Sequence, residues 1–161
     1  MILVFALLIS LGVLGYLWYR KSGALEVTFS QTFVKAFSSE NNAVFAETYV
    51  RMGDKDPTGQ YRFTTKGGGK APDERWNSVV QKIFQEKLQK VKSLGVTPST
   101  MQWEGIEGVE ISGQKLEDRR LEKLIIRVNS NVPNLRISIS RAMLVARGWV
   151  LTEDSLVEFS K

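Results

Sequence analysis

Carboxylates are the groups in this chain that could do acid–base or metal chemistry, because the sequence contains no histidine and no cysteine. Histidine is the commonest acid/base residue and metal ligand, and cysteine supplies thiolate ligands and nucleophiles. Glu104 and Glu110 share one face of an expected strand but lie roughly 20 Å apart when it is extended, too far for an acid/base pair or a metal site. Glu107 points to the other face, and Glu122 and Asp154 stand elsewhere. We therefore expect solvated surface carboxylates and predict no catalytic residue and no metal ligand.

The glycine run Gly67–Lys70 is the other segment with a chemical motif, because glycine-rich loops before a lysine can cradle phosphates. A phosphate-binding loop follows a buried apolar strand and places serine or threonine after the lysine, whereas Ala71 and Pro72 follow here. The sequence also lacks a G-x-S-x-G elbow, and no histidine base is available to activate a hydroxyl. We predict a protein that is not an enzyme and binds no cofactor.

An uncharged apolar run over 2–19 dominates the N-terminal part of the sequence. As a helix rising ~1.5 Å per residue it spans roughly 27 Å, enough for the hydrocarbon core of a bilayer. Aromatic rings prefer the headgroup level, and charges mark the boundary of lipid, which indicates a membrane interface made of Tyr16, Trp18, Tyr19, Arg20 and Lys21. We interpret residues 1–21 as a retained single-pass transmembrane anchor, joined by a tether over 22–28 to a domain over 29–161.

A cleaved signal peptide is the alternative interpretation of this segment. Signal peptides begin with a basic region and end at a site of small residues, whereas this run has no basic side chain before it and is followed by Arg20 and Lys21. The positive-inside rule counts Lys and Arg near the ends of a span, and here they follow it. The rule therefore places the domain on the cytoplasmic side of a membrane.

Two short helices are expected at the start of the domain. Thr28 and Gln31 stand at the positions of a capping box, and apolar residues then recur at helical spacing, which predicts a helix over 29–37. A second cap at Ser38–Ser39 predicts a helix over 40–51. The aromatic side chains of these helices are expected to belong to a hydrophobic core.

A long polar loop precedes the strongest helical pattern in the chain. Residues 53–72 are polar and rich in glycine, so we expect a mobile loop in which only 61–65 alternate enough to suggest a short strand. Asp73 then suits an N-cap, and apolar residues at i, i+3, i+4 and i+7 predict a helix over 74–94. Gly95 can close this helix.

The last third of the sequence alternates between apolar and polar residues, the pattern of half-buried strands. Apolar residues occupy one parity at 124–128 and again at 135–139, on either side of an Asn131–Asn134 turn. Other strand-like runs lie at 101–111, where glycines interrupt the run, and at 143–146, 149–151 and 156–159. These patterns predict an α+β fold, in which an N-terminal transmembrane helix precedes a small domain of helices packed on a curved antiparallel sheet.

This order of elements resembles the nuclear-transport-factor-2-like (cystatin-like) superfamily of α+β cones. Members open with a short helix such as Gln31–Phe37 and a second such as Asn42–Val50, and a longer helix then leads into a bent antiparallel sheet. Their last strands often read as an apolar run, a basic residue, Gly, Trp and a second apolar run, as 144–151 does here. The resemblance covers residues 28–160. It implies a cone-shaped domain, and the single-span members of the superfamily are assembly or scaffold parts rather than catalysts.

The excess of basic residues is mild, with 22 Lys and Arg against 17 Asp and Glu and a net charge of +5. The long helix concentrates some of it in a candidate basic patch made of Lys82, Lys87, Lys90 and Lys92. Such a patch could bind anionic lipid headgroups. Nucleic acid is not favoured, because the sequence contains no stacking platform and no nucleic-acid-binding module.

The retained anchor, the well-specified core and the missing catalytic groups together favour one function. We expect a non-catalytic membrane protein that serves as an accessory or assembly subunit of a membrane protein complex, with the bilayer and other membrane-protein subunits as its partners. Trp103, Arg136 and Trp149 are candidate docking residues, although a large aromatic such as Trp149 is more often core. The alternatives are a membrane-tethered ligand-binding or enzymatic cone, and a basic domain that binds lipid headgroups or nucleic acid.

Overall fold

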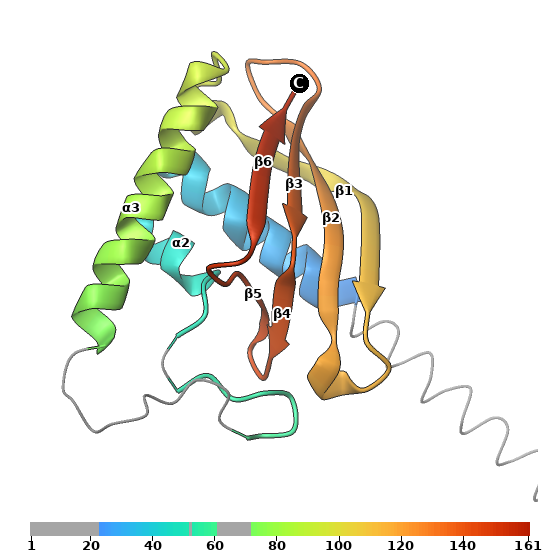
Figure 1. Ribbon diagram of the computed structural model, residues 1–161. Helices are drawn as coiled ribbons and strands as arrows, with labels where there is room; N and C mark the ends of the chain where they lie inside the picture. The colour runs from blue at the N-terminus through green and yellow to red at the C-terminus, as the bar shows by residue number, and fades with distance from the viewer. Residues whose placement is uncertain (1–22, 52, 61–71) are drawn as a thin grey trace, which may run out of the picture.

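The structure, a computed structural model, describes residues 23–51, 53–60 and 72–161 (Figure 1). The helices come first: an N-terminal helix over 23–38, α2 (Asn42–Glu47), α3 (Pro72–Ser93) and the 3-10 turn η1 (Pro98–Thr100). The strands are β1 (Gln102–Ser112), β2 (Arg120–Asn129), β3 (Leu135–Ser140), β4 (Ala142–Val145), β5 (Gly148–Val150) and β6 (Leu156–Ser160), with the 3-10 turn η2 (Leu116–Asp118) between β1 and β2. The predicted α+β fold with an antiparallel sheet is confirmed.

The strands form one curved sheet in which each named pair is antiparallel. β2 lies at its centre, with β1 on one side; on the other side β2 pairs with β3 along 124–128 and with β4 at 120–121. Only Arg141, at a φ of 60°, separates β3 from β4, so these two strands are successive segments of one bent ribbon. β6 and β5 continue the sheet outward from β3 and β4.

The hydrophobic core fills the space between the helices and the inner face of the sheet. The predicted alternation along β2 and β3 is confirmed, because the inward side chains at 124, 126, 128, 135, 137 and 139 are at most 2% exposed. Against them packs a cluster of phenylalanine rings whose centroids lie 4.9 to 5.8 Å apart, made of Phe33, Phe37, Phe45, Phe84 and Phe159. This cluster joins the N-terminal helix, α2, α3 and β6.

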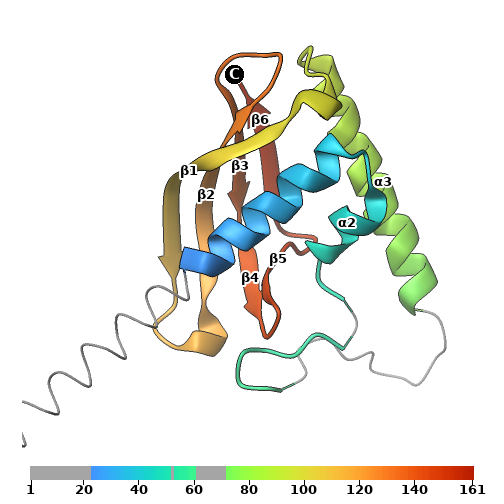
Figure 2. The same ribbon diagram turned by 180° about the vertical axis from the view of Figure 1, so that it is seen from behind.

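The N-terminal helix crosses the inner face of the sheet (Figure 2) and begins earlier than the sequence predicts. It is helical from residue 23, so the predicted tether over 22–28 is wrong over 23–28. Thr28 is not an N-cap, because its hydroxyl donates to the carbonyl of Ala24 one turn earlier, at 2.7 Å. Leu25 and Phe29 continue the i, i+4 spacing of the helix backwards and pack on the core, which stabilises these early turns.

α2 is shorter than the predicted 40–51, and a different residue caps it. The side-chain oxygen of Asn41 accepts from the N–H groups of Ala43 and Val44 at 2.9 and 3.2 Å. The hydroxyls predicted as caps, those of Ser38–Ser39, instead donate to the carbonyl of Lys35 and close the preceding helix. Residues 48–50 leave the helix because they bond to the segment after β5: Val50 donates to the Leu151 carbonyl at 2.9 Å and Leu151 to that of Thr48 at 2.7 Å.

α3 stands beside β6 and matches the predicted long helix (Figure 1). Its buried stripe is confirmed, because Val80, Phe84, Leu88 and Val91 are at most 4% exposed. The helix begins at Pro72, so Asp73 belongs to its first turn and is not the N-cap; proline suits that first position because it lacks the N–H that would stay unbonded. After the helix, Gly95 adopts a φ of 80°.

Within residues 23–51, 53–60 and 72–161, no helix is long and apolar enough to cross a membrane. The predicted anchor over 1–21, with its interface residues Tyr16, Trp18, Tyr19, Arg20 and Lys21, lies outside the described residues. The strand predicted over 61–65 lies outside them as well. The described start of the predicted mobile loop, 53–60, is bonded to the domain, since Ala146 donates to the Lys55 carbonyl at 2.8 Å.

Candidate interaction surface

The outer face of the sheet carries no helix from the described parts of the chain (Figures 1 and 2). We call outer face the side chains that alternate with the core: Gly105, Glu107, Gly108 and Glu110 of β1; Lys123, Ile125, Arg127 and Asn129 of β2; Arg136, Ser138 and Ser140 of β3; and Leu156, Glu158 and Ser160 of β6. Only Ile125 and Leu156 among them are large and apolar. The face is therefore mostly polar, with charged side chains from β1, β2, β3 and β6.

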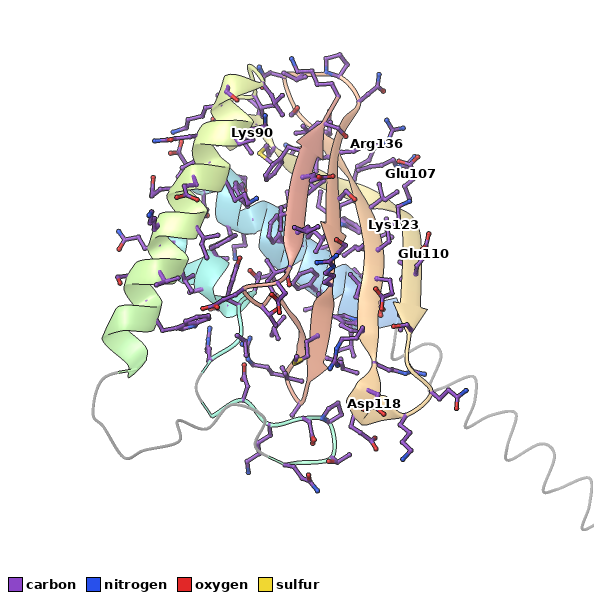
Figure 3. All side chains as sticks on the ribbon, in the orientation of Figure 1. Lys90, Glu107, Glu110, Asp118, Lys123 and Arg136 are labelled. Atoms are coloured by element: carbon purple, nitrogen blue, oxygen red, sulfur yellow. The ribbon has the colours of Figure 1, made fainter. Side chains whose placement is uncertain are left out.

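Three charged residues lie close together on the outer face, and we call Glu107, Arg127 and Arg136 the charge triad. Figure 3 labels two of its members, Glu107 on β1 and Arg136 on β3. Arg136 Nε donates to Glu107 at 2.7 Å, across the strand that lies between β1 and β3. Hydrogen bonding from Arg136 lowers the pKa of Glu107, and the charges of Arg136 and Arg127 act in the same direction. The carboxylate of Glu107 therefore stays ionised at pH values where an isolated glutamate would begin to take up a proton.

Arg127 is the member of the triad that remains open to a partner. It lies directly opposite Arg136 on the neighbouring strand, and like charges in that position repel. It forms no ion pair with a carboxylate in the part of the chain that the structure describes. Its guanidinium lies over Gly105, 3.6 Å from where a Cβ of that residue would be, which is an ordinary van der Waals distance. The triad therefore presents an exposed cation whose natural complement is a carboxylate.

The two predicted docking tryptophans do not belong to this surface. Trp149 is only 4% exposed, which confirms the expectation that a large aromatic here belongs to the core, and its ring N–H donates to the carboxylate of Glu26 at 2.8 Å. Trp103 is partly buried and donates to the hydroxyl of Ser30 at 2.9 Å. Both rings face the N-terminal helix, so of the three predicted docking residues only Arg136 lies on the exposed face.

Glu26 is a buried carboxylate, 3% exposed, that no sequence pattern predicted. One oxygen of its carboxylate accepts from Trp149, and the other has no partner among the described residues. Burying a carboxylate with so few hydrogen bonds costs free energy. The i, i+4 spacing of Glu26 and Ser30 could have placed them on one helix face, but only after the helix had been extended back through the expected tether.

Arg147, in the predicted Gly-Trp motif, ties the tip of the β4–β5 hairpin to the rest of the domain. Its guanidinium donates to both carboxylate oxygens of Asp54, at 2.8 and 2.9 Å, and to the main-chain carbonyls of Glu47 and Tyr49. Gly148 follows at a φ of 124°, a conformation that favours glycine. The motif therefore has a structural role, and we call the contacts of Arg147 with Asp54, Glu47 and Tyr49 the clasp.

A cavity of about 270 Å³ opens between the N-terminal helix, α2 and this hairpin. Its polar lining is made of Thr28, Thr32, Glu47, Thr48, Arg51 and Arg147. It lies beside the phenylalanine cluster and does not penetrate it, because those rings are at most 7% exposed. Its volume falls just below the usual range for ligand pockets, roughly 300 to 1,000 Å³.

The lysines predicted as a basic patch spread around α3. Successive residues turn by about 100°, so Lys87 and Lys92 point about 140° apart, and Lys82 and Lys90 point in further directions. Lys87 donates to the Val157 carbonyl of β6 at 2.9 Å, and Lys92 pairs with Glu40 at 2.8 Å. The four lysines therefore do not form one cluster, and two of them already have protein partners.

Tyr49 yields a prediction about alkaline stability. Burial, assisted by the negative charge of Glu153, raises the pKa of Tyr49 to about 12 from 10.0. Between these two pH values the unfolded chain loses the phenol proton while the folded chain keeps it, so the free energy of unfolding should fall by about 2 kcal/mol as pH rises through this window. Urea unfolding of the full chain in mild detergent measures the effect. Tyr49→Phe is the control; an equal fall in that variant would show that Tyr49 is not responsible.

An apolar patch is exposed at the end of the sheet where β1 connects to β2. Val109, Ile111 and Leu116 form this patch and are 41%, 39% and 37% exposed. Val109 and Ile111 lie opposite Leu124 and Leu121, which are fully buried, so β1 extends the inner face beyond the area that the described helices cover.

No metal centre was predicted, and residues 23–51, 53–60 and 72–161 contain no group of three or more acidic side chains that could hold a metal ion. Comparison of the chain with protein-family models, curated proteins and solved structures finds no match to any of them.

Proposed function

We propose that this chain is a single-pass membrane protein whose α+β domain acts as a non-catalytic accessory or assembly subunit of a membrane protein complex. The observation that carries the proposal is the uncovered outer face of the sheet, with the charge triad exposed on it. A sheet face without a covering layer is a surface on which a partner protein can pack. The uncharged run over 2–19 supplies the proposed anchor.

The partner that fits this face is a subunit that presents a carboxylate. Glu107 is already neutralised by Arg136, whereas Arg127 has its positive charge available. Charge complementarity of this kind fixes the register of an interface and excludes partners of the wrong sign.

The filled interior supports this function over a ligand-binding or enzymatic cone. A deep pocket would need open space between the helices and the sheet, where the rings of Phe33, Phe37 and Phe45 are fully buried. The order of elements, two helices before a longer helix and a bent antiparallel sheet, supports the proposed resemblance to the nuclear-transport-factor-2-like superfamily, although the first helix, over 23–38, is longer than expected.

Reversing the charge of Arg127 tests the proposal. Arg127→Glu should reduce the amount of partner that copurifies with the full chain in mild detergent by about tenfold or more, because a carboxylate would then face a carboxylate. Lys82→Glu, the same charge change at an exposed position on α3, should leave the recovery unchanged. Recovery of the wild-type chain as an unaccompanied monomer from several mild detergents would contradict the proposed function. Equal recovery with Arg127→Glu and wild type would exclude the outer face as the docking site.

A further inference from the structure

We infer that the domain rests on the lipid bilayer through the end of the sheet where β1 connects to β2, with Val109, Ile111 and Leu116 entering the interfacial region. The inference rests on the membrane anchor of the proposed function. It adds an orientation that the anchor alone does not fix, because a tethered domain could otherwise hang free of the membrane.

The apolar run and the domain are separated by only a short stretch of chain. The uncharged run ends at Tyr19, and the N-terminal helix has begun by Gly23. Even fully extended, the chain between these two residues spans only about 14 Å, at roughly 3.5 Å per residue. With the run in the bilayer, the first turn of the helix is therefore held at or near the headgroup layer, which is several ångströms thick.

The first turn of the N-terminal helix lies close to the exposed apolar side chains of β1. The start of the N-terminal helix lies beside the end of β1 in both Figure 1 and Figure 2. Val109 and Ile111 belong to this end of β1 and expose about two fifths of their surface. Moving apolar side chains out of water is favourable, so a bilayer held this close is the surface that we expect to cover them.

The connection between β1 and β2 is a compact turn. A Cβ on Gly113 would lie 2.5 Å from the carbonyl oxygen of Asp118, so the β1–β2 connection folds tightly back on itself. This compact turn holds Leu116 outward, 37% exposed, at the extreme of the sheet marked by Asp118 in Figure 3. Lys115 stands next to Leu116, and a basic side chain beside an apolar one suits the headgroup level.

A second copy of the chain is a poorer occupant of this surface. Pairing along β1 would bring Glu104, Glu107 and Glu110 of both copies together, with no basic residue on the strand to balance them. The register of β1 also shifts at three places, and such bulges blunt an edge against strand addition. Lipid is the occupant that needs neither a complementary charge nor a regular edge.

A fluorescent label on Leu116 tests the contact. Since the chain has no cysteine, Leu116→Cys can carry a single environment-sensitive nitrobenzoxadiazole dye in the full chain. The labelled protein is reconstituted into phosphatidylcholine vesicles with and without a phosphatidylcholine that bears a nitroxide near its headgroup. Leu156→Cys, at a 50% exposed position on β6, is the matched control. Ser10→Cys, within the uncharged run, reports on the anchor with a nitroxide placed deep in the acyl chain.

We expect the nitroxide to reduce emission at position 116 by about half or more, as for a dye in the interfacial region, and to leave position 156 unchanged. Quenching at position 10 without quenching at 116 would overturn this inference and leave the proposed anchor standing. Absence of quenching at position 10 would overturn the anchor and the inference together. A dye at 116 that is shielded from water but not quenched by lipid would place a protein there, and would also overturn the inference.

Discussion

Replacing Phe37 by alanine should lower the free energy of unfolding by about 3–5 kcal/mol. Its ring is fully buried and lies 5.1 to 5.7 Å from the rings of Phe33, Phe45, Phe84 and Phe159. These neighbours come from the N-terminal helix, α2, α3 and β6, so no single element can move to fill the cavity without losing contacts elsewhere. Urea unfolding of the full chain in mild detergent, followed by tryptophan fluorescence, measures the loss.

Two further variants give this prediction its controls. Phe37→Leu keeps most of the apolar volume and should cost clearly less than alanine. Leu156→Ala removes a side chain that is 50% exposed and should change the free energy of unfolding by no more than about 0.5 kcal/mol. If Phe37→Ala were as mild as Leu156→Ala, the phenylalanine cluster would not be the centre of the core.

The parts of the fold that the sequence predicted are those set by regular burial over several residues. The stripe on α3 and the alternation along β2 and β3 are long, and burial of each apolar side chain adds to the same choice of structure. β1 is more complicated, because its register shifts let Ile106 lie opposite Ile126 on the inner face although simple alternation from Trp103 would turn it outward. Two such shifts separate Trp103 from Val109, so both still face inward as their shared parity predicted.

Helix boundaries were predicted less well, because local capping signals compete with tertiary contacts. Thr28 has the residue type of an N-cap, yet packing of Leu25 and Phe29 on the core continues the helix through it. At the other end of this region, hydrogen bonds between 48–50 and the segment after β5 end α2 early, and those partners lie about a hundred residues away in sequence. A capping pattern contributes about 1 kcal/mol, which such packing can outweigh.

The same limit applies to the candidate interaction surface. The alternation of β3 placed Arg136 on the wet face, but its partner Glu107 lies 29 residues earlier and on a strand that is not adjacent to β3. Nothing in either local sequence indicates this pairing. Burial of Trp149 matches the expectation for a large aromatic, but its partner Glu26 lies in the predicted tether, where no helix was expected. Trp103 bonds to Ser30, 73 residues earlier, and such a long-range contact leaves no mark in the local sequence.

Arg147→Ala should lower the free energy of unfolding by about 2–3 kcal/mol, the largest effect expected for a polar residue in this domain. The substitution removes the fork that binds Asp54 through both carboxylate oxygens and leaves the carbonyls of Glu47 and Tyr49 without this donor. The side chain of Asp54 is only 10% exposed, so its charge would remain poorly solvated. That of Arg147 is 31% exposed, which keeps the loss below that of a fully buried ion pair.

The shape of the guanidinium, and not its charge alone, should account for this effect. Arg147→Lys retains the positive charge but cannot make the two-pronged contact with Asp54, so it should recover less than half of the loss. Lys82→Ala, which removes an exposed charge on α3, should leave the free energy of unfolding nearly unchanged. Hydrogen exchange gives a second measurement: the amide of Ala146, bonded to the carbonyl of Lys55, should lose protection in Arg147→Ala because the hairpin tip is released. Full stability together with unchanged protection at Ala146 would rule out the clasp.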